Sequence, residues 1–391
     1  MAYEGNDRIG VTTPLSRSEF AVTDRFVYFN HAAVGVLPIQ TRHAIDTFVH
    51  AHADAGVMGT YTYEAKMPAY RERIGRFVGA HGSDIAILRS TNDGATVIAQ
   101  GLDWQPGDEL LLSDNEFPSN ALPWLVLRER GVHVKFISTD RERMTPDVLR
   151  REITPRTRVV AVSWVSFSDG YRHDLAALGE IAHDAGAIFC VDAIQGLGAF
   201  PLDVNSCGID ALYNGGQKWL MALQGVSFLY VRDTLLERLH VAAPGWRSAA
   251  DMWDFLNYEQ PVIDDTSRFE GGTPNFVGAL SLDRSIELLD RAGAAKIGAH
   301  VLLLTDRLCE GLQRCGAELL TLRGDGISSG IVTFRVPGCD SVTLGRALQA
   351  QGVITTWRPN GIRVSPHGYN TAEEVDRMLD LIPQCVRSVA S

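Results

Sequence analysis

The sequence predicts an α/β protein, in which a mainly parallel sheet is sandwiched by helices and a small C-terminal α+β domain follows. From Asp84 to Val231, short apolar runs alternate with segments in which apolar residues recur every three or four positions. Apolar strands that alternate with amphipathic helices are typical of a parallel sheet covered on both faces. After about Phe276, two long helical segments precede a different mixture of strands and helices.

Each expected element is an apolar run or a helical repeat of apolar residues. In the first part we expect strands at 85–88, 109–113, 132–137, 159–165, 187–191 and 226–231, and helices at 38–56, 64–79, from about Gly94 to Gly101, and at 123–130, 145–152 and 175–185. In the last part we expect helices at 276–291, 296–314, 341–351 and 371–386, and strands at 330–336, 353–356 and 362–365. A chain of 391 residues exceeds the usual size of one core. We therefore expect an N-terminal segment (1–25), a large domain (26–275) and a small domain (276–391) that the N-terminal residues can join.

The composition is that of an ordinary soluble enzyme, with 45% hydrophobic and 21% charged residues. A net charge of −11 argues against general affinity for nucleic acid or anionic membranes. The N-terminus lacks a signal-peptide pattern, and no apolar run is long enough to span a bilayer. Six cysteines without a CxxC motif indicate reduced thiols in a cytoplasmic protein, and no HExxH or comparable metal motif occurs.

Two charged residues stand at the ends of apolar runs. Asp192 ends the run 187–191, and Lys218 follows the Gly215–Gly216 turn. Asp192 alone could cap a turn, and Lys218 alone could be a surface residue, since buried charges need partners. Together they could hold opposite ends of one cofactor. Pyridoxal phosphate requires such a pair, because an amine forms a Schiff base with it and a carboxylate keeps its ring nitrogen protonated.

The turn Ser90–Gly94 is a candidate phosphate site. A strand ends there, small polar residues follow, and a helix begins, so backbone N–H groups could bind a dianion. The alternative is an ordinary helix N-cap formed by Ser90, Thr91 or Asn92. Dinucleotide and P-loop fingerprints are absent from the sequence.

Arg363 lies between apolar Ile362 and Val364 in an expected strand, so it faces away from their side. It could bind a substrate carboxylate through its two parallel N–H groups, or it could be a solvated edge residue. Arg268 and Arg358 are weaker candidates of the same kind.

The motifs VDAIQ at 191–195 and GGQKWL at 215–220 resemble those of the class V aminotransferase group of fold-type I pyridoxal-phosphate enzymes. This group includes cysteine desulfurases, isopenicillin N epimerase-like proteins, kynureninases and carbon–sulfur lyases. The resemblance extends from about residue 28 to 375. It implies a seven-stranded sheet, pyridoxal 5'-phosphate bound by the large domain, and a homodimer with shared active sites.

The resemblance also implies a role for each matching residue. Lys218 would carry the internal aldimine and move the Cα proton, while Asp192 would pair with the ring nitrogen and Gln195 would approach the ring hydroxyl. The remaining roles are phosphate binding by Ser90, Thr91, Asn92 and Gln217, with Thr273 of the neighbouring subunit; ring stacking by Phe117; and binding of the substrate carboxylate by Arg363. Apart from the resemblance, Arg358 and His31 are further candidate substrate residues.

Two departures from the family pattern bear on the reaction. Phe117 stands where desulfurases have a ring-stacking histidine, and the loop 355–361 lacks the nucleophilic cysteine of desulfurases. We therefore expect an enzyme other than a persulfide-forming cysteine desulfurase. Our first expectation is a carbon–sulfur β-lyase on an S-substituted cysteine, because β-elimination needs little beyond Lys218. An aminotransferase, an epimerase using His31 or Tyr61 as a second base, a decarboxylating deaminase and a non-catalytic module stay open.

Overall fold

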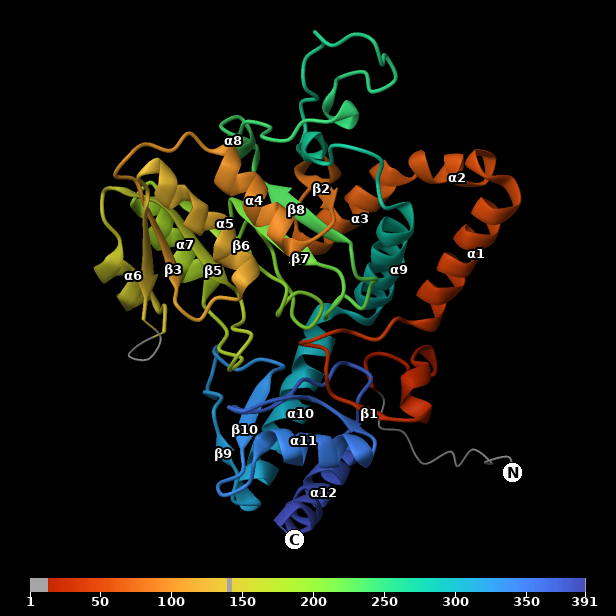
Figure 1. Ribbon diagram of the computed structural model, residues 1–391, viewed down its shortest axis with the longest axis vertical. Helices are drawn as coiled ribbons and strands as arrows, with labels where there is room; N and C mark the ends of the chain where they lie inside the picture. The colour runs from red at the N-terminus through yellow and green to blue at the C-terminus, as the bar shows by residue number, and fades with distance from the viewer. Residues whose placement is uncertain (1–12, 139–142, 391) are drawn as a thin grey trace.

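The computed structural model describes residues 13–138 and 143–390, and its largest feature is a seven-stranded sheet (Figure 1). The strands are β2 (Ile85–Leu88), β3 (Glu109–Ser113), β4 (His133–Ile137), β5 (Thr157–Ser163), β6 (Ile188–Asp192), β7 (Ala211–Gly215) and β8 (Ser227–Val231). Their order is β2-β8-β7-β6-β5-β3-β4. β8 is antiparallel to both of its neighbours, and every other pair is parallel. The predicted mainly parallel seven-stranded sheet is therefore confirmed.

Both faces of this sheet are buried. In β6, Phe189 and Val191 belong to one hydrophobic cluster, while Ile188 and Cys190 belong to a second cluster on the opposite face. Successive side chains of a strand point to opposite faces, so a strand covered on both sides must be apolar throughout. This is why six of the seven strands could be recognised as apolar runs; β7, which ends in Asn214 and Gly215, was not among the expected strands.

Helices cover the two faces of the sheet, as Figure 1 shows. The helices of this part are α1 (Ile39–Ala55), α2 (Val57–Glu64), α3 (Met67–Val78), α4 (Thr91–Gly101), α5 (Leu122–Leu125), α6 (Pro146–Glu152), α7 (Leu175–Asp184), α8 (Asp233–Leu236) and α9 (Phe276–Ala292). Short 3-10 turns occur at Arg17–Glu19, Ala21–Asp24, Gly82–Asp84, Pro118–Asn120, Val126–Arg130, Trp246–Ser248 and Thr266–Phe269. Within the described ranges, no helix combines the length and the apolar character that crossing a membrane requires.

The C-terminal part forms a smaller layer with its own core. An antiparallel sheet in the order β12-β13-β10-β9 packs with three helices. These elements are β9 (Glu318–Leu319), β10 (Val332–Arg335), β12 (Thr356–Arg358), β13 (Gly361–Val364), α10 (Ala294–Arg314), α11 (Ser341–Ala350) and α12 (Ala372–Ala390). They occupy the lower part of Figure 1. The α+β character is as expected, while the residue boundaries of the domains stay a prediction.

One predicted strand differs. The run 353–356 is divided, because β11 (Val353–Ile354) pairs with β1 (Val27–Tyr28), whereas β12 joins the four-stranded sheet. The chain passes from one sheet to the other at Thr355, and both halves have the apolar and β-branched residues of a strand. Their division therefore leaves no trace in the local pattern.

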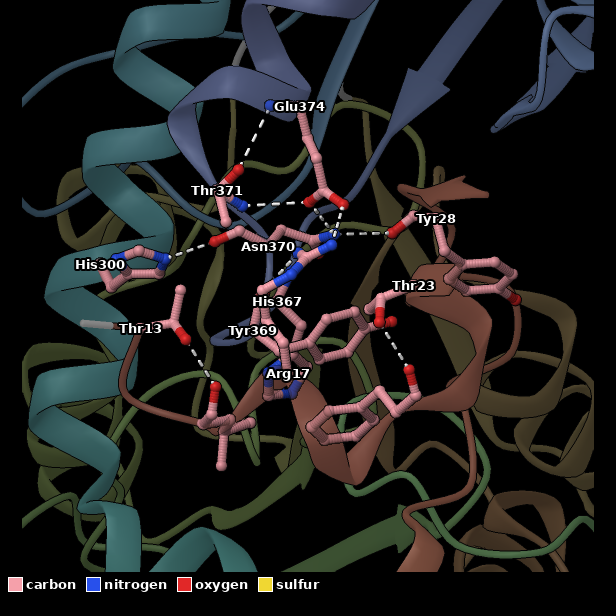
Figure 2. A network of polar contacts seen from close by, with 12 residues as sticks. Thr13, Arg17, Thr23, Tyr28, His300, His367, Tyr369, Asn370, Thr371 and Glu374 are labelled. Atoms are coloured by element: carbon pink, nitrogen blue, oxygen red, sulfur yellow. Dashed lines mark hydrogen bonds and ion pairs between the residues drawn. The ribbon is translucent and has the colours of Figure 1, made fainter. Parts of the chain in front are cut away.

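Hydrogen bonds attach the N-terminal segment to the C-terminal part (Figure 2). Arg17 Nη2 donates to Glu374 Oε1 at 2.9 Å. Asn370 Nδ2 donates to Glu374 Oε2 at 2.9 Å and to the Tyr28 carbonyl at 3.3 Å. The Asn370 carbonyl lies 2.8 Å from His300 Nε2 of α10. Residues near both ends of the chain therefore form one packed unit.

Candidate active site

Asp192 is the last residue of β6, at the carboxyl edge of the parallel strands, where ligands of such sheets bind. Its side chain is only 2% exposed, and Oδ1 accepts the Ile194 backbone N–H at 2.9 Å. Burial raises the pKa of Asp192 to about 7, and the Glu116 carboxyl acts in the same direction, whereas the Ile194 N–H and Lys218 oppose the shift. The carboxylate is thus a buried group whose negative charge is partly balanced by Lys218.

Lys218 lies in the turn after β7, and it is also buried. Burial lowers the pKa of its amine to about 8; Asp192 opposes this shift, and Arg363 contributes to it. Its Nζ lies 5.3 Å from the ring centroid of Phe117. The surface alternative considered for this lysine is therefore wrong, because the amine is enclosed between a carboxylate, a guanidinium and an aromatic ring.

The backbone around Lys218 is held closely. Gly35 N–H donates to the Gln217 carbonyl at 2.7 Å, and a methyl group added at Gly35 would lie 2.1 Å from the Lys218 carbonyl oxygen. Met221 has a positive φ of 54°, which is uncommon for a residue other than glycine. Only a glycine at position 35 permits this close approach, so the turn that carries the amine is fixed on its backbone side.

The start of α4 meets the end of β7. Ser90 caps the helix, since its hydroxyl accepts the Asp93 N–H at 3.2 Å. Thr91 is buried, and a methyl group at Gly215 would lie 2.9 Å from Thr91 Oγ1 and 2.5 Å from Gln217 Oε1. The fold therefore brings Thr91 and Gln217 together around a glycine, at the first turn of a helix. The N-cap alternative is realised by Ser90, and phosphate binding at this turn stays a prediction.

Two other predicted phosphate residues lie at the surface. Asn92 is exposed, and its amide nitrogen lies 3.4 Å from Thr96 Oγ1 on the same helix. Thr273 is exposed in the loop before α9. The roles predicted for both residues remain predictions.

Gln195 is buried with both ends of its amide engaged. Its Nε2 donates to the Ala32 carbonyl at 3.0 Å, and its Oε1 accepts the Trp219 indole N–H at 3.0 Å. These bonds connect the VDAIQ and GGQKWL motifs to the segment after β1. Gln195 therefore positions Trp219, the residue next to Lys218. A contact between Gln195 and a cofactor stays a prediction.

His31 is completely buried, at 0% exposure. Its Nδ1 lies 3.1 Å from the Ser365 carbonyl, and its Nε2 lies 3.1 Å from the Tyr369 hydroxyl. Burial, with a contribution from His367, lowers its pKa well below the usual value. Because both ring nitrogens have partners, the geometry offers no support for the predicted substrate role of His31.

A pocket of about 610 Å³ opens between the large sheet and the small one. Its wall is formed by Asn115, Arg143, Phe167, Ser168, Asp169, Leu320, Thr333, Thr356, Arg358, Asn360, Gly361 and Arg363. Arg363 Nη1 donates to the Phe167 carbonyl at 2.7 Å, and the Phe167 ring lies edge-on to Phe117 with 5.3 Å between centroids. The predicted residues Arg363 and Arg358 therefore line the same pocket. Phe167 of this pocket contacts Phe117, and the Phe117 ring in turn lies beside Lys218 Nζ.

Glu116 is a buried charged group that we did not predict from the sequence. Its Oε1 accepts the Ser163 N–H at 2.8 Å, and its Oε2 accepts from the Asn120 amide at 3.0 Å and from the Ser163 hydroxyl. Burial raises the pKa of Glu116, and these hydrogen bonds oppose the shift. Its position shortly after β3, at the same edge of the sheet as Asp192, was the available signal.

These residues suit pyridoxal phosphate. Among the residues that the structure describes, Lys218 Nζ has no hydrogen-bond acceptor, and Asp192 uses only one carboxylate oxygen. A buried amine with a lowered pKa is the form that reacts with an aldehyde. Thr91, Gln217 and Gly215 leave room for a group at the helix start, where a phosphate is favourably bound. The residues at this site therefore fit both the aldehyde and the phosphate of this cofactor.

The model of the family "Aminotransferase class-V" matches residues 27–378. A probable cysteine desulfurase of Pyrococcus abyssi is 28% identical over 399 residues, covering 96% of this chain and 98% of that protein. A Bacillus subtilis protein named an uncharacterized aminotransferase is 30% identical over 312 residues, covering 80% and 82%. The apo structure of a cysteine desulfurase from Thermococcus onnurineus NA1 superposes with a TM-score of 0.87 at 27% identity, covering 95% and 97%.

These comparisons correct one expectation. We predicted, from the cysteine-free loop 355–361, that the chain is not a persulfide-forming cysteine desulfurase. That exclusion is wrong, because relatives similar over nearly the whole chain, in sequence and in structure, are named cysteine desulfurases. The composition of one loop is too local a signal, since a reactive thiol can be supplied by any segment that reaches the site.

Proposed function

The chain belongs to the class V aminotransferase family, whose cofactor is pyridoxal 5'-phosphate, and on that premise we propose that it cleaves a carbon–sulfur bond of cysteine or an S-substituted cysteine. The observation that carries the proposal is the buried amine of Lys218, with a pKa of about 8, beside a pocket that has arginines for a carboxylate. Among the described residues that line this pocket there is no histidine or lysine to serve as a second base. Loss of a sulfur leaving group from Cβ needs only one base.

Lys218 is the proposed acid and base. The bound cofactor supplies an electron-withdrawing ring that stabilises negative charge at the Cα atom of an amino acid. A general base is most effective when its pKa is close to the working pH, and an amine with a pKa of about 8 meets that condition. We assign removal of the Cα proton to Lys218 Nζ, which then carries that proton.

Asp192 and Phe117 are the proposed neighbours of the ring. The carboxylate of Asp192 would face the ring nitrogen and favour its protonated form, since opposite charges stabilise each other strongly in a buried site. Phe117 would cover one face of the ring, because its own ring already lies beside Lys218 Nζ. Thr91 and Gln217, with Ser90, Asn92 and Gln195 as further contacts, would hold the rest of the cofactor.

Arg363 is the proposed partner of the substrate α-carboxylate. It is 8% exposed, and within the described chain it donates only to the Phe167 carbonyl. A carboxylate can accept two parallel bonds from one guanidinium, which are stronger than a bond to a neutral carbonyl. The substrate would therefore displace or supplement the Phe167 contact and place its Cα close to Lys218.

We also propose a homodimer in which Thr273 of one subunit completes the phosphate site of the other. Apolar side chains are unusually exposed on α2 and on the loop between α8 and α9, which projects from the body in Figure 1. They are Val57 (71%), Met58 (77%), Tyr61 (64%), Trp253 (51%), Phe255 (61%), Leu256 (82%) and Tyr258 (84%). Exposed apolar side chains in such numbers are typical of interfaces.

The test is product analysis with a panel of amino acids. Pyruvate with a free thiol from an S-substituted cysteine, or release of the sulfur of cysteine, supports the proposal. A keto acid that retains the whole side chain indicates transamination and contradicts it. Lys218→Arg keeps the positive charge but removes the primary amine, so it should abolish turnover while Lys66→Arg should not.

A further inference from the structure

The pocket beside Lys218 has more positive charge than one α-carboxylate requires. Its wall contains three arginines and one aspartate, in a chain whose net charge is −11. Arg143 is paired with Asp169 across the pocket. Within the described residues, Arg358 and Arg363 have no carboxylate partner. Among the residues that the structure describes, these two positive charges in one cavity are therefore not compensated by a carboxylate.

The strand register explains why both arginines face this cavity. Thr356 of β12 is the register partner of Arg363 in β13, and residues paired across strands lie on the same face. Arg358 is two positions from Thr356, so it also lies on this face. Trp357, between them, lies on the opposite face, where a methyl group added at Gly345 of α11 would contact its ring.

Phe167 contacts both guanidinium groups. Arg363 Nη1 is bonded to its carbonyl at 2.7 Å, and Arg358 Cζ lies 5.9 Å from its ring centroid. Arg363 is buried, whereas Arg358 is exposed at the mouth of the pocket. Burial, together with the charge of Arg358, lowers the pKa of Arg363 to about 10. Arg363 therefore places one positive charge inside the pocket, and Arg358 places a second one at its mouth.

We propose that the substrate carries a second acidic group on its sulfur substituent, and that Arg358 binds this group while Arg363 binds the α-carboxylate. This inference rests on the proposed carbon–sulfur cleavage for the identity of the substrate. A dianionic substrate compensates both guanidinium groups, whereas a neutral substituent leaves like charges facing each other beside a buried amine. Arg358 is then a specificity residue at the mouth of the pocket.

Turnover is compared for S-(2-carboxyethyl)cysteine and its neutral isostere S-(2-carbamoylethyl)cysteine, using the holoenzyme. We expect kcat/KM to favour the acid by about 10- to 100-fold, as for other hydrogen bonds between charged groups. Arg358→Gln should reduce this preference to near unity. Arg346→Gln is the matched control, because Arg346 stacks on the far side of Trp357, outside the pocket, and it should retain the preference. Equal use of both substrates by the unmodified enzyme, or a preference that survives in Arg358→Gln, overturns the proposal.

Binding of inert acids separates this inference from the proposed reaction. Glutarate and butyrate are titrated into the holoenzyme, and the dissociation constant of each is measured by calorimetry. We expect glutarate to bind about tenfold more tightly than butyrate. The difference should disappear in Arg358→Gln and persist in Arg346→Gln. If this result holds but no sulfur-containing amino acid is cleaved, the proposed reaction fails and the dianion site stands. If such amino acids are cleaved but glutarate has no advantage, the dianion site fails and the reaction stands.

Discussion

The pKa values of Lys218 and Asp192 are displaced in opposite directions by the same cause. Burial lowers the pKa of the Lys218 amine to about 8 and raises the pKa of the Asp192 carboxyl to about 7. In each case the charge of the other residue opposes the shift. The charged forms of both groups are therefore disfavoured by desolvation, and each depends on the other for compensation. Removing one of them must change the titration of the other.

We predict that Asp192→Asn lowers the pKa of Lys218 further in the cofactor-free protein. The Asp192 carboxylate raises that pKa, so its loss leaves only the contributions of burial and Arg363, which lower it. The measurement is the pH dependence of reductive methylation at Lys218, followed by mass spectrometry. The midpoint should lie near pH 8 in the unmodified protein and below it in the variant. Asp210→Asn removes a distant buried carboxylate and should leave the midpoint unchanged; a midpoint that rises in Asp192→Asn contradicts the coupling.

The same carboxylate predicts a pH dependence of stability. The pKa of Asp192 is raised from 3.8 to about 7, so between these values the folded protein binds more protons than the unfolded chain. Its contribution to the free energy of unfolding is therefore present below about pH 4 and is lost as the pH rises to 7. The loss is at most about 4 kcal/mol. Urea unfolding of the cofactor-free protein at pH 5 and pH 8 should show a smaller decrease for Asp192→Asn than for the unmodified chain, and an equal decrease argues against a buried carboxylate.

Gly215→Ala should weaken cofactor binding without unfolding the protein. The new methyl group would lie 2.5 Å from Gln217 Oε1 and 2.9 Å from Thr91 Oγ1, and both are side-chain atoms that can move. Their movement would displace the groups that we propose to contact the phosphate. We expect the dissociation constant of pyridoxal 5'-phosphate to rise about tenfold or more, measured by spectral titration of the cofactor-free protein. Gly324→Ala is the matched control, because a methyl group there makes only ordinary contacts with the Ile327 side chain, at 3.4 Å or more, on an exposed loop. Equal affinity of both variants would place the phosphate elsewhere.

Six of the seven strands of the large sheet could be predicted from their apolar runs, and inner strands such as β6 are apolar because both of their faces are buried. The site was predicted less completely. Asp192 and the turn before Lys218 are marked by local pattern, but the contact of Arg363 with Phe167 joins residues 196 positions apart. The ion pair of Arg143 with Asp169 is similarly non-local. No periodicity specifies such partners, since Arg363 meets Phe167 only when the small sheet packs against the large one, and Arg143 meets Asp169 only when two separate loops come together.

Arg363→Ala should weaken amino-acid binding and leave cofactor binding nearly unchanged. The guanidinium lines the pocket that we propose for the substrate, and its loss would leave a substrate carboxylate without a partner, which typically costs on the order of 30-fold or more in affinity. The measurements are the KM of the best substrate and the dissociation constant of pyridoxal 5'-phosphate. Arg335→Ala removes a surface arginine that pairs with Glu318 and serves as the control. A comparable loss of affinity for cofactor and substrate in Arg363→Ala would indicate a structural role for this residue.

The proposed homodimer makes a prediction about two exposed leucines. Leu256 is 82% exposed on the projecting loop at the top of Figure 1, and Leu303 is 68% exposed on α10, which lies in the lower part of that view. A charge at a buried interface position is destabilising because it is desolvated without a partner. Leu256→Glu should therefore convert a dimer to a monomer in light scattering at micromolar concentration, and Leu303→Glu should not.

Because Thr273 would then be lost from the neighbouring site, the monomer should also bind pyridoxal 5'-phosphate more weakly. Thr273→Ala should have the same effect on cofactor binding within an intact dimer. A protein that is monomeric before any substitution, or a Thr273→Ala variant with unchanged cofactor affinity, contradicts the shared site.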